Sequence, residues 1–207
     1  SKIFITNGFN ADLVCVVCKT DPEGGAKGTS LLMVETKDLK GFSKNTPLKK
    51  IGMKGQDTCE LFFDNCRIPA GNLLGGQEGQ GFFQLMAQLP RERLMIAVGA
   101  IAGIEAALEE AISYTKERKA FGKAIADFQN TKFKLAEMAT EARIGRVFVD
   151  DCIEKLNAGT LDTETASMAK WWCTEKQFET ANKALQLHGG YGYMMEYPIA
   201  HYFADSR

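Results

Sequence analysis

One segment of the chain places a carboxylate where it could act as a general base. Glu92 lies two residues after Pro90, with an arginine on either side, at the predicted start of a long helix. A positioned carboxylate can remove a proton in a site that excludes water. Acidic residues are also common in the first helical turn because they favour the helix dipole, and neighbouring arginines make a carboxyl more acidic unless burial opposes them. Taken alone, the segment favours this structural explanation.

Two further segments have residue types that suit a cofactor. Residues 186–193 read QLHGGYGY, and three glycines in four positions let a backbone approach an anionic or planar group closely. Residues 117–122 read ERKAFG, in which Arg118 could hold a phosphate. A helix C-cap followed by a turn and a solvated helix end are the ordinary explanations of these segments, and a lone histidine such as His188 is more often structural than catalytic.

Several other classes of site have no support in the sequence. It contains no G-x-G-x-x-G after a predicted strand, no P-loop, no H-E-x-x-H and no G-x-S-x-G. Cys15 and Cys18 would point to opposite faces of a strand, which disfavours a metal or redox site, and we expect all six cysteines to be reduced. The formal net charge of −1 gives no reason to expect nucleic-acid binding, and no apolar run approaches the roughly 20 residues of a transmembrane helix.

The elements that must position these segments fall into two parts. Short β-branched and apolar runs separated by Gly, Pro, Asn and Asp predict strands at residues 2–6, 13–20, 30–35 and 59–63. Apolar spacings of three and four predict long helices at residues 94–118, 128–156 and 162–188, the last with Asp162 as its cap. We therefore expect an α+β fold: a small antiparallel β-barrel or sandwich over residues 1–75, followed by an antiparallel helix bundle over residues 76–207.

Taken in order, the motifs resemble the acyl-CoA dehydrogenase family. The similar segments are FITNG at 4–8, LKKIG at 48–52, IP at 68–69, ERKAFG at 117–122, QLHGGYGY at 186–193 and EYP at 196–198. The resemblance covers essentially the whole chain and implies a middle β-barrel domain followed by a C-terminal four-helix bundle. The family's N-terminal helical domain and last C-terminal loop have no counterpart in the sequence. The resemblance thus implies a fragment truncated at both ends, which by itself would bind flavin weakly or not at all and would be inactive.

The resemblance also implies a reaction. In the family, a carboxylate removes an α-proton from an acyl-CoA thioester while a hydride passes from the β-carbon to FAD, giving a trans-2-enoyl-CoA in fatty acid β-oxidation. Most members carry this base on the C-terminal loop, but the long-chain and isovaleryl branches carry it at the position that matches Glu92. Local similarity favours the long-chain branch. Arg93 matches a substrate-side arginine, and Phe82 matches an aromatic residue near the acyl pocket.

The cofactor expected from the resemblance is FAD, and no metal is expected. The residues that match FAD contacts are Phe4, Ile5 and Thr6 at the flavin ring, and Arg118, Phe121, Gln129, Gln186, Leu187, His188, Gly189 and Gly190 at the adenosine and pyrophosphate end. In the family, this second group reaches across from a neighbouring subunit, so we expect a homotetramer built as a dimer of dimers. Ala120 replaces a common threonine, which removes one hydrogen bond worth about 1 kcal/mol.

Alternatives to a long-chain enzyme remain open. One is an isovaleryl-type enzyme for branched acyl chains, and another is a non-catalytic homologous subunit of a heteromeric dehydrogenase. The presence of Glu92 and of the flavin-side residues argues against the second. The resemblance implies electron-transfer flavoprotein as redox partner, and either a bacterial cytoplasm or a mitochondrial matrix as the compartment.

Overall fold

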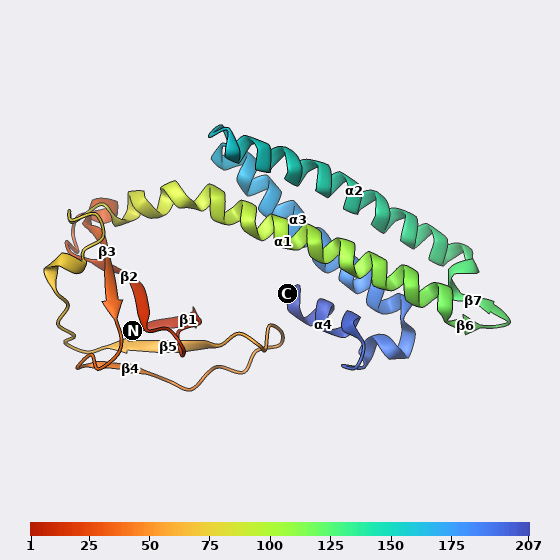
Figure 1. Ribbon diagram of the computed structural model, residues 1–207, viewed down its shortest axis with the longest axis horizontal. Helices are drawn as coiled ribbons and strands as arrows, with labels where there is room; N and C mark the ends of the chain where they lie inside the picture. The colour runs from red at the N-terminus through yellow and green to blue at the C-terminus, as the bar shows by residue number, and fades with distance from the viewer. The chain divides into compact units, whose positions relative to one another are not determined.

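The computed structural model describes residues 1–207, which form two compact units, Ser1–Gln88 and Leu89–Arg207 (Figure 1). The first unit is built from strands and the second from helices, which confirms the predicted α+β fold class. None of the helices combines the length and the apolar content that crossing a membrane would require.

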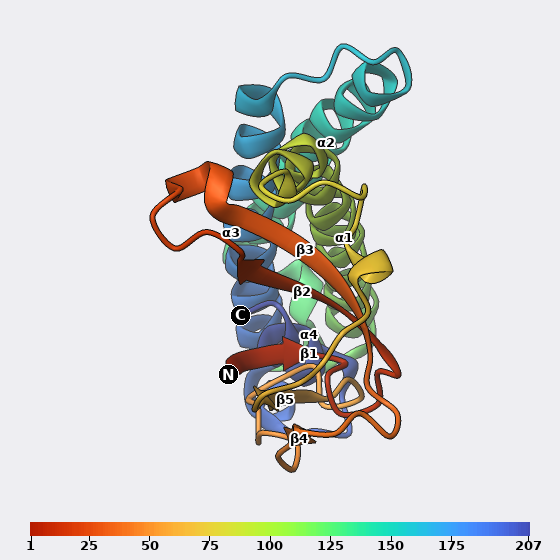
Figure 2. The same cartoon turned by 90° about the vertical axis from the view of Figure 1, so that its left-hand side faces the viewer.

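The first unit contains two small antiparallel sheets. One has the strand order β1-β5-β4, and the other pairs β2 with β3. The strands are β1 (Lys2–Thr6), β2 (Leu13–Lys19), β3 (Thr29–Glu35), β4 (Phe42–Lys44) and β5 (Thr58–Phe63), with short 3-10 helices at Gly25–Gly28 and Ala70–Asn72. In Figures 1 and 2 the long β2–β3 ribbon and the three-stranded sheet run in crossing directions. The four strands predicted from the sequence are all present, and β4 is additional.

The second unit is dominated by three long antiparallel helices (Figure 1). They are α1 (Gly81–Glu117, which begins in the first unit), α2 (Gln129–Asn157) and α3 (Thr163–Leu187). A hairpin of β6 (Lys119–Ala120) and β7 (Lys123–Ala124) and the 3-10 turn Ile125–Asp127 join α1 to α2. The 3-10 turn η4 (Gly189–Tyr193) joins α3 to the short helix α4 (Pro198–Asp205).

The start of α1 differs from the prediction. The sequence placed the helix start after Pro90, whereas α1 begins at Gly81 and includes Pro90. Proline lacks an N–H and so removes one helical hydrogen bond, but the helix continues through it. Glu92 therefore lies more than two turns inside α1, and the prediction that it occupies a first helical turn is wrong. A favourable interaction with the helix dipole does not explain this residue, because the dipole acts within the first turn.

The helices enclose an apolar core that repeats at helical spacing. Ile101 and Ile104 of α1 are fully buried against small and branched residues of α2 and α3. A Cβ added at Gly145 of α2 would lie 2.3 Å from the Ile101 Cδ1 atom, so the glycine allows the two helices to approach closely. A second buried cluster supports the end of the bundle where α1 and α3 finish; its members are Ala107, Ala111, Met138, Ala184 and Ile199.

The cap predicted for the third helix is confirmed. The Asp162 carboxylate accepts a hydrogen bond from the Thr165 backbone N–H at 2.7 Å and a second from the Thr165 hydroxyl at 2.7 Å. These bonds hold the pKa of the Asp162 carboxyl below its usual value, and the bond from the backbone N–H has the larger effect. The start of α3 is thus fixed by a side-chain cap.

Candidate cofactor site and candidate catalytic base

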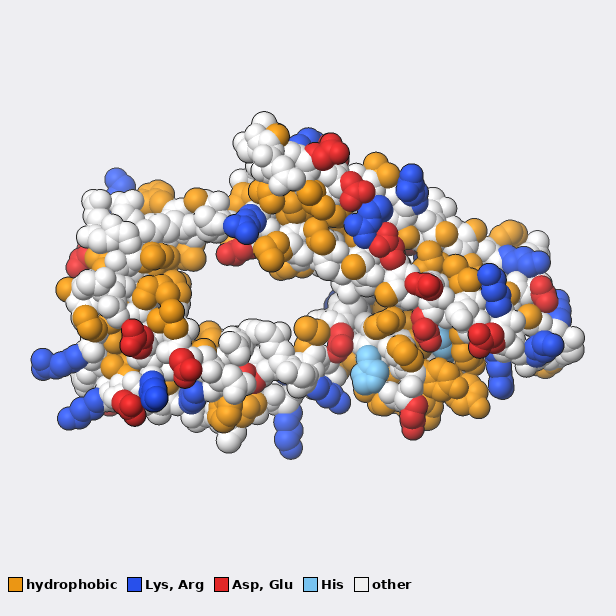
Figure 3. All heavy atoms as spheres, in the orientation of Figure 1, with side chains coloured by type: hydrophobic (Ala, Val, Ile, Leu, Met, Phe, Trp, Pro, Cys, Tyr) orange, Lys and Arg blue, Asp and Glu red, His pale blue; other side chains and the backbone are white.

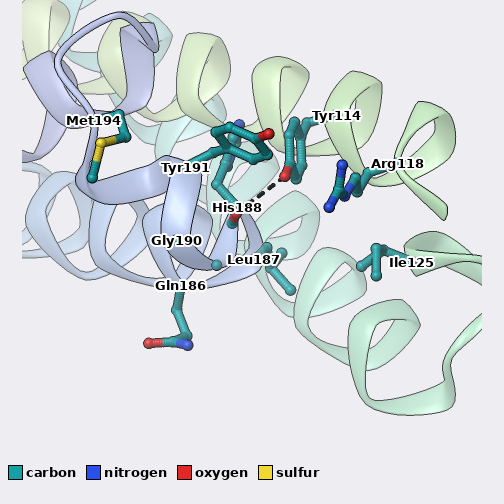
Figure 4. Close-up of a pocket in the computed structure, with 10 residues that line it drawn as sticks. Tyr114, Arg118, Ile125, Gln186, Leu187, His188, Gly190, Tyr191 and Met194 are labelled. Carbon is teal, nitrogen blue, oxygen red and sulfur yellow. Dashed lines mark hydrogen bonds between the residues drawn. The ribbon is translucent and has the colours of Figure 1, made fainter. Parts of the chain in front are cut away.

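A cavity of about 500 Å³ lies in the second unit, where the end of α1 meets the end of α3 (Figure 4). Its volume is within the roughly 300–1,000 Å³ range of small-molecule sites. The lining residues are Tyr114, Arg118, Ile125, Gln186, Leu187, His188, Gly189, Gly190, Tyr191 and Met194. The fold thus brings Arg118 together with the predicted residues 186–190, although they are far apart in the sequence.

Arg118 is placed by the backbone at the end of α1. Its N–H donates to the Tyr114 carbonyl at 2.9 Å, and its own carbonyl accepts from the Ile125 N–H at 2.8 Å. The guanidinium lies 5.4 Å from the centre of the Tyr191 ring, a cation–π arrangement. No carboxylate pairs with this guanidinium. The cavity therefore carries a positive charge that is free to bind an anion.

The three glycines of residues 189–192 differ in the space on the side of their missing side chains. A Cβ built on Gly189 or Gly190 meets nothing within 4 Å, so this part of the backbone is open on the side of its missing side chains. A Cβ on Gly192 would lie 2.3 Å from the Leu185 carbonyl oxygen, so that glycine is required for packing. Only Gly189 has a left-handed backbone, with φ of +60°. The close approach of a ligand is thus possible at the first two glycines and not at the third.

His188 lines the cavity and is only 2% exposed. Its Nδ1 atom lies 2.8 Å from the Ala184 carbonyl oxygen, while its Nε2 atom is buried without a hydrogen-bond partner. Tyr114 stacks on the imidazole ring, with ring centres 4.1 Å apart, and donates its hydroxyl hydrogen to the His188 carbonyl at 3.1 Å. Burial raises the pKa of the Tyr114 hydroxyl, against the opposing effect of Arg118.

Tyr114 was not among the residues predicted from the sequence. A signal for it exists, because Tyr114 precedes Arg118 by four positions and such residues share a helix face. Its contact with His188 could not be predicted, since the two residues are 74 positions apart.

Two predicted cofactor residues lie outside the lining of this cavity. Phe121 is in the turn between β6 and β7, has φ of +52° and is 95% exposed. Its ring contacts Phe128 edge to face, with centres 6.3 Å apart. Gln129 is exposed at the first position of α2. A bulky aromatic side chain that leaves almost all of its surface in water is available for contact with another chain.

Residues 4–6, predicted at the flavin ring, belong to the first unit. Strand β1 contains an irregularity in which Lys2 pairs with Leu61 and Ile5 with Cys59, so β1 has one extra residue there. Phe4, within this bulge, has φ of +59° and is 70% exposed. Thr6 is exposed and pairs opposite Thr58. Bulges often re-aim side chains next to active sites, and a bulky residue at positive φ is strained.

Glu92 is exposed on α1, and its carboxylate makes no hydrogen bond or ion pair. The arginines on either side do not pair with it, because successive helical residues point in different directions. Arg93 is half-buried and is also free of ion pairs. Met95 and Ile96, one turn further along, are 64% and 51% exposed. The chain thus presents a free carboxylate beside apolar side chains.

The remaining predicted site residue, Phe82, lies in the first turn of α1, which belongs to the first unit. It is 38% exposed and contacts Phe83 edge to face, with ring centres 5.9 Å apart. Figure 3 shows that hydrophobic side chains are exposed at many places on this face of the molecule, between charged ones. An aromatic residue with this exposure can still receive an apolar ligand.

The cysteines form no site. All six are free thiols, and Cys15 is exposed while Cys18 is half-buried, as expected for opposite faces of β2. Burial raises the pKa of Cys173 to about 11, which leaves it as an unreactive thiol in the core. No cluster of three His, Cys, Asp or Glu side chains has a geometry suited to a metal ion.

Comparison with known proteins assigns the two parts of the chain. Residues 1–66 match the model of the acyl-CoA dehydrogenase middle domain, and residues 79–207 match that of the acyl-CoA dehydrogenase C-terminal domain. The chain belongs to the acyl-CoA dehydrogenase family. The resemblance stated from the sequence motifs is confirmed.

The relatives of this acyl-CoA dehydrogenase family member include long-chain and branched-chain enzymes. All of the chain aligns, at 50% identity, with 48% of the long-chain specific acyl-CoA dehydrogenase of Mus musculus mitochondria, and at 37% identity with 50% of the isovaleryl-CoA dehydrogenase of Oryza sativa mitochondria. A crystal structure of acyl-CoA dehydrogenase from Geobacillus kaustophilus superposes with a TM-score of 0.95 and 50% identity, over 98% of this chain and 53% of that one. The chain spans about half the length of the curated relatives it matches.

Proposed function

We propose that this chain supplies the middle and C-terminal parts of a flavin-dependent acyl-CoA dehydrogenase, which converts long, straight acyl-CoA thioesters into trans-2-enoyl-CoA in fatty acid β-oxidation. The observation that carries the proposal is the cavity at the end of α1, which is lined by both Arg118 and residues 186–190. We take residues 1–75 and 76–207 as its two domains.

The residues present fit the adenosine diphosphate portion of FAD. Arg118 offers an unpaired cation for a pyrophosphate, and Gly189 and Gly190 leave an open backbone surface that a Cβ would otherwise fill. Gln186 contributes an exposed amide, a donor and acceptor for polar groups. Phe4, Ile5 and Thr6 would flank the flavin ring, which, when bound, supplies the hydride acceptor.

The exposure of Phe121 and Gln129 supports an assembly in which they contact the cofactor of a neighbouring subunit. This arrangement makes the cofactor site dependent on association, and we propose a homotetramer.

Glu92 is the proposed base. Its carboxylate is committed to no other partner, so it can accept the α-proton of a bound thioester. An acyl chain lying over Met95 and Ile96 would cover apolar surface and exclude water from the carboxylate, which makes a carboxylate a stronger base. Arg93 would help to orient the substrate on its own side of α1, and Phe82 would contact the acyl chain.

Two observations bear on the alternatives. The 37% identity to an isovaleryl-CoA dehydrogenase keeps a branched-chain substrate as the second candidate, behind the long-chain one at 50%. The free Glu92 carboxylate argues against a non-catalytic subunit of a heteromeric enzyme. The proposed electron acceptor is electron-transfer flavoprotein, and the proposed compartment is a mitochondrial matrix or a bacterial cytoplasm, since the relatives come from both mitochondria and bacteria.

The test is an anaerobic titration with acyl-CoAs from isovaleryl to palmitoyl, followed by flavin absorbance. It uses a form of the protein extended to the length of its relatives, as wild type and as Glu92→Gln. We expect palmitoyl-CoA to reduce the wild-type flavin fastest, and the variant to react about 10²- to 10⁴-fold more slowly, the usual contribution of a general base. Glu109→Gln is the matched control, because Glu109 is also an exposed α1 carboxylate without a partner.

Each result decides one part of the proposal. Normal reduction in Glu92→Gln would place the base elsewhere. Faster reduction by isovaleryl-CoA would favour the branched-chain alternative. The 207-residue chain alone should purify without stoichiometric flavin and without turnover, and stoichiometric flavin on it would contradict the proposed need for further segments and a neighbouring subunit.

A further inference from the structure

We propose that Tyr114 is a positioning residue: by its stack on the His188 ring and its hydrogen bond to the His188 carbonyl, it fixes the Gly189–Gly190 backbone against which the ligand of the cavity binds. The ring that Tyr114 restrains is held by the Ala184 carbonyl in the tautomer with hydrogen on Nδ1. The inference rests on the proposed function in one respect, namely that the ligand is the adenosine diphosphate portion of a flavin. The arrangement of Tyr114 and His188 is called the clamp below.

Two contacts of different kinds make up the clamp. The rings of Tyr114 and His188 stack at 4.1 Å with an interplanar angle of 21°, which restrains the imidazole. The Tyr114 hydroxyl donates to the His188 carbonyl oxygen at 3.1 Å, which restrains the backbone directly before Gly189. One side chain on α1 therefore fixes both the ring and the main chain of the residue that ends α3.

The surroundings of the imidazole select one tautomer. Nδ1 lies 2.8 Å from the Ala184 carbonyl oxygen, which can only accept a hydrogen bond, so Nδ1 carries the hydrogen. Nε2 is buried and has no partner. A hydrogen on Nε2 would create a buried donor without an acceptor and would leave Nδ1 and the carbonyl as two facing acceptors, so the other tautomer is disfavoured twice.

The backbone of Gly189 and Gly190 must be restrained from both sides to keep one conformation. Glycine loses more conformational freedom on ordering than any other residue, so an open glycine pair tends to sample many backbone states. Downstream, Gly192 is held because it packs directly on the Leu185 carbonyl. Upstream, the clamp holds His188. The turn is thus restrained at both ends, and of its three glycines Gly189 and Gly190 are the two with open space on the side of the missing Cβ.

The hydroxyl group separates positioning from plain core packing. A phenylalanine could make the same stack, but only a tyrosine donates to the His188 carbonyl. Tyr114→Phe therefore removes the restraint on the backbone and keeps the ring contact. Tyr193→Phe is the matched control, because Tyr193 lies in the same turn, is 83% exposed and has a hydroxyl that makes no hydrogen bond.

The first measurement reads the tautomer on the 207-residue chain with ¹⁵N-labelled histidine and long-range ¹H–¹⁵N NMR. The chain has only two histidines, and His201→Gln assigns them. We expect hydrogen on Nδ1 of His188. His201 should show the reverse, because its Nε2 contacts the Met195 carbonyl at 2.9 Å. Hydrogen on Nε2 of His188, or an equal mixture, would overturn the clamp whatever the protein's function.

The second measurement is the affinity for ADP, by calorimetry, on the form extended to the length of the relatives. We expect Tyr114→Phe to raise the Kd about fivefold, the ratio that corresponds to one hydrogen bond, with the His188 tautomer unchanged and with Tyr193→Phe equal to wild type. Wild-type affinity in Tyr114→Phe would overturn the role of the clamp in binding. Failure of the wild type to bind ADP would overturn the proposed cofactor site and the ligand part of this inference, while the NMR result still decides the clamp itself.

Discussion

The two ends of α1 differ in how far the chain alone prepares them. At the C-terminal end, Tyr114 and Arg118 meet residues of α3 and line a defined cavity. Nearer the N-terminal end, Glu92 has no partner, and the neighbouring Met95 and Ile96 are more than half exposed. The proposed cofactor site is therefore already formed as a cavity, whereas around the proposed base this chain provides only the α1 side of a site.

Glu105, on the same helix as Glu92, is a carboxylate that already has a partner. Glu105 accepts two hydrogen bonds from Arg146 of α2, at 2.9 and 2.6 Å. These bonds lower the pKa of the Glu105 carboxyl. Such a carboxylate is used in holding α1 to α2 and is a poor proton acceptor. The contrast teaches that the absence of partners around Glu92 is itself the feature that suits a base, provided that other parts of the protein cover it.

The largest expected effect is a loss of FAD affinity on substitution of Arg118, at the C-terminal end of α1. Arg118→Gln removes the unpaired cation of the cavity and with it a charge-assisted interaction with the proposed pyrophosphate. Such interactions are worth about 1.5–3 kcal/mol, so FAD affinity of the extended protein should fall roughly tenfold to a hundredfold, measured by fluorescence titration. Lys116→Gln, an exposed cation in the last turn of α1 without an ion-pair partner, should leave affinity unchanged. Equal losses in both variants would mean that only overall charge matters.

The next effect separates the glycines of the same turn. Gly192→Ala would force a Cβ to within 2.3 Å of the Leu185 carbonyl, and overpacking of this kind costs about 1–3 kcal/mol. Urea unfolding should show that loss. The Cβ added in Gly190→Ala meets nothing within 4 Å. This variant should therefore keep the wild-type free energy of unfolding, while ADP binding by the extended protein should weaken. If Gly190→Ala bound ADP normally, the open backbone would not be a ligand surface.

Much of the fold was predictable from local pattern, and the exceptions have physical causes. Strands β1, β2, β3 and β5 followed from β-branched runs between turn residues, but β4 is only three residues long and carries no alternating pattern of its own. The helix start predicted after Pro90 is wrong because α1 continues through the proline despite the missing N–H. The short helix α4 has Pro198 in its first turn, a signal that could have revealed it.

The candidate site was predictable only in part. The motifs identified Arg118 and residues 186–190, and the structure places them around one cavity. Tyr114 was missed because its role depends on a contact across 74 positions, which periodicity does not encode. The positive φ of Phe4 was equally hidden, since it arises from the pairing register of β1 with β5.

The smallest expected effect tests the contrast between the two glutamates through pH. The pKa of Glu105 is lower in the folded state than its unfolded value of 4.5, so its bonds to Arg146 stabilise the fold fully above about pH 4.5 and less as pH falls through the folded pKa. Both side chains are partly exposed, so the contribution should be only about 0.2–1 kcal/mol. The free energies of unfolding in urea of wild type and Glu105→Gln should differ most near pH 7 and converge below pH 4.5. The difference between wild type and Arg146→Gln should depend on pH in the same way. A difference that stays constant with pH would mean that the Glu105 carboxylate is not held by Arg146 in solution, and Glu105 would then be as free of partners as Glu92.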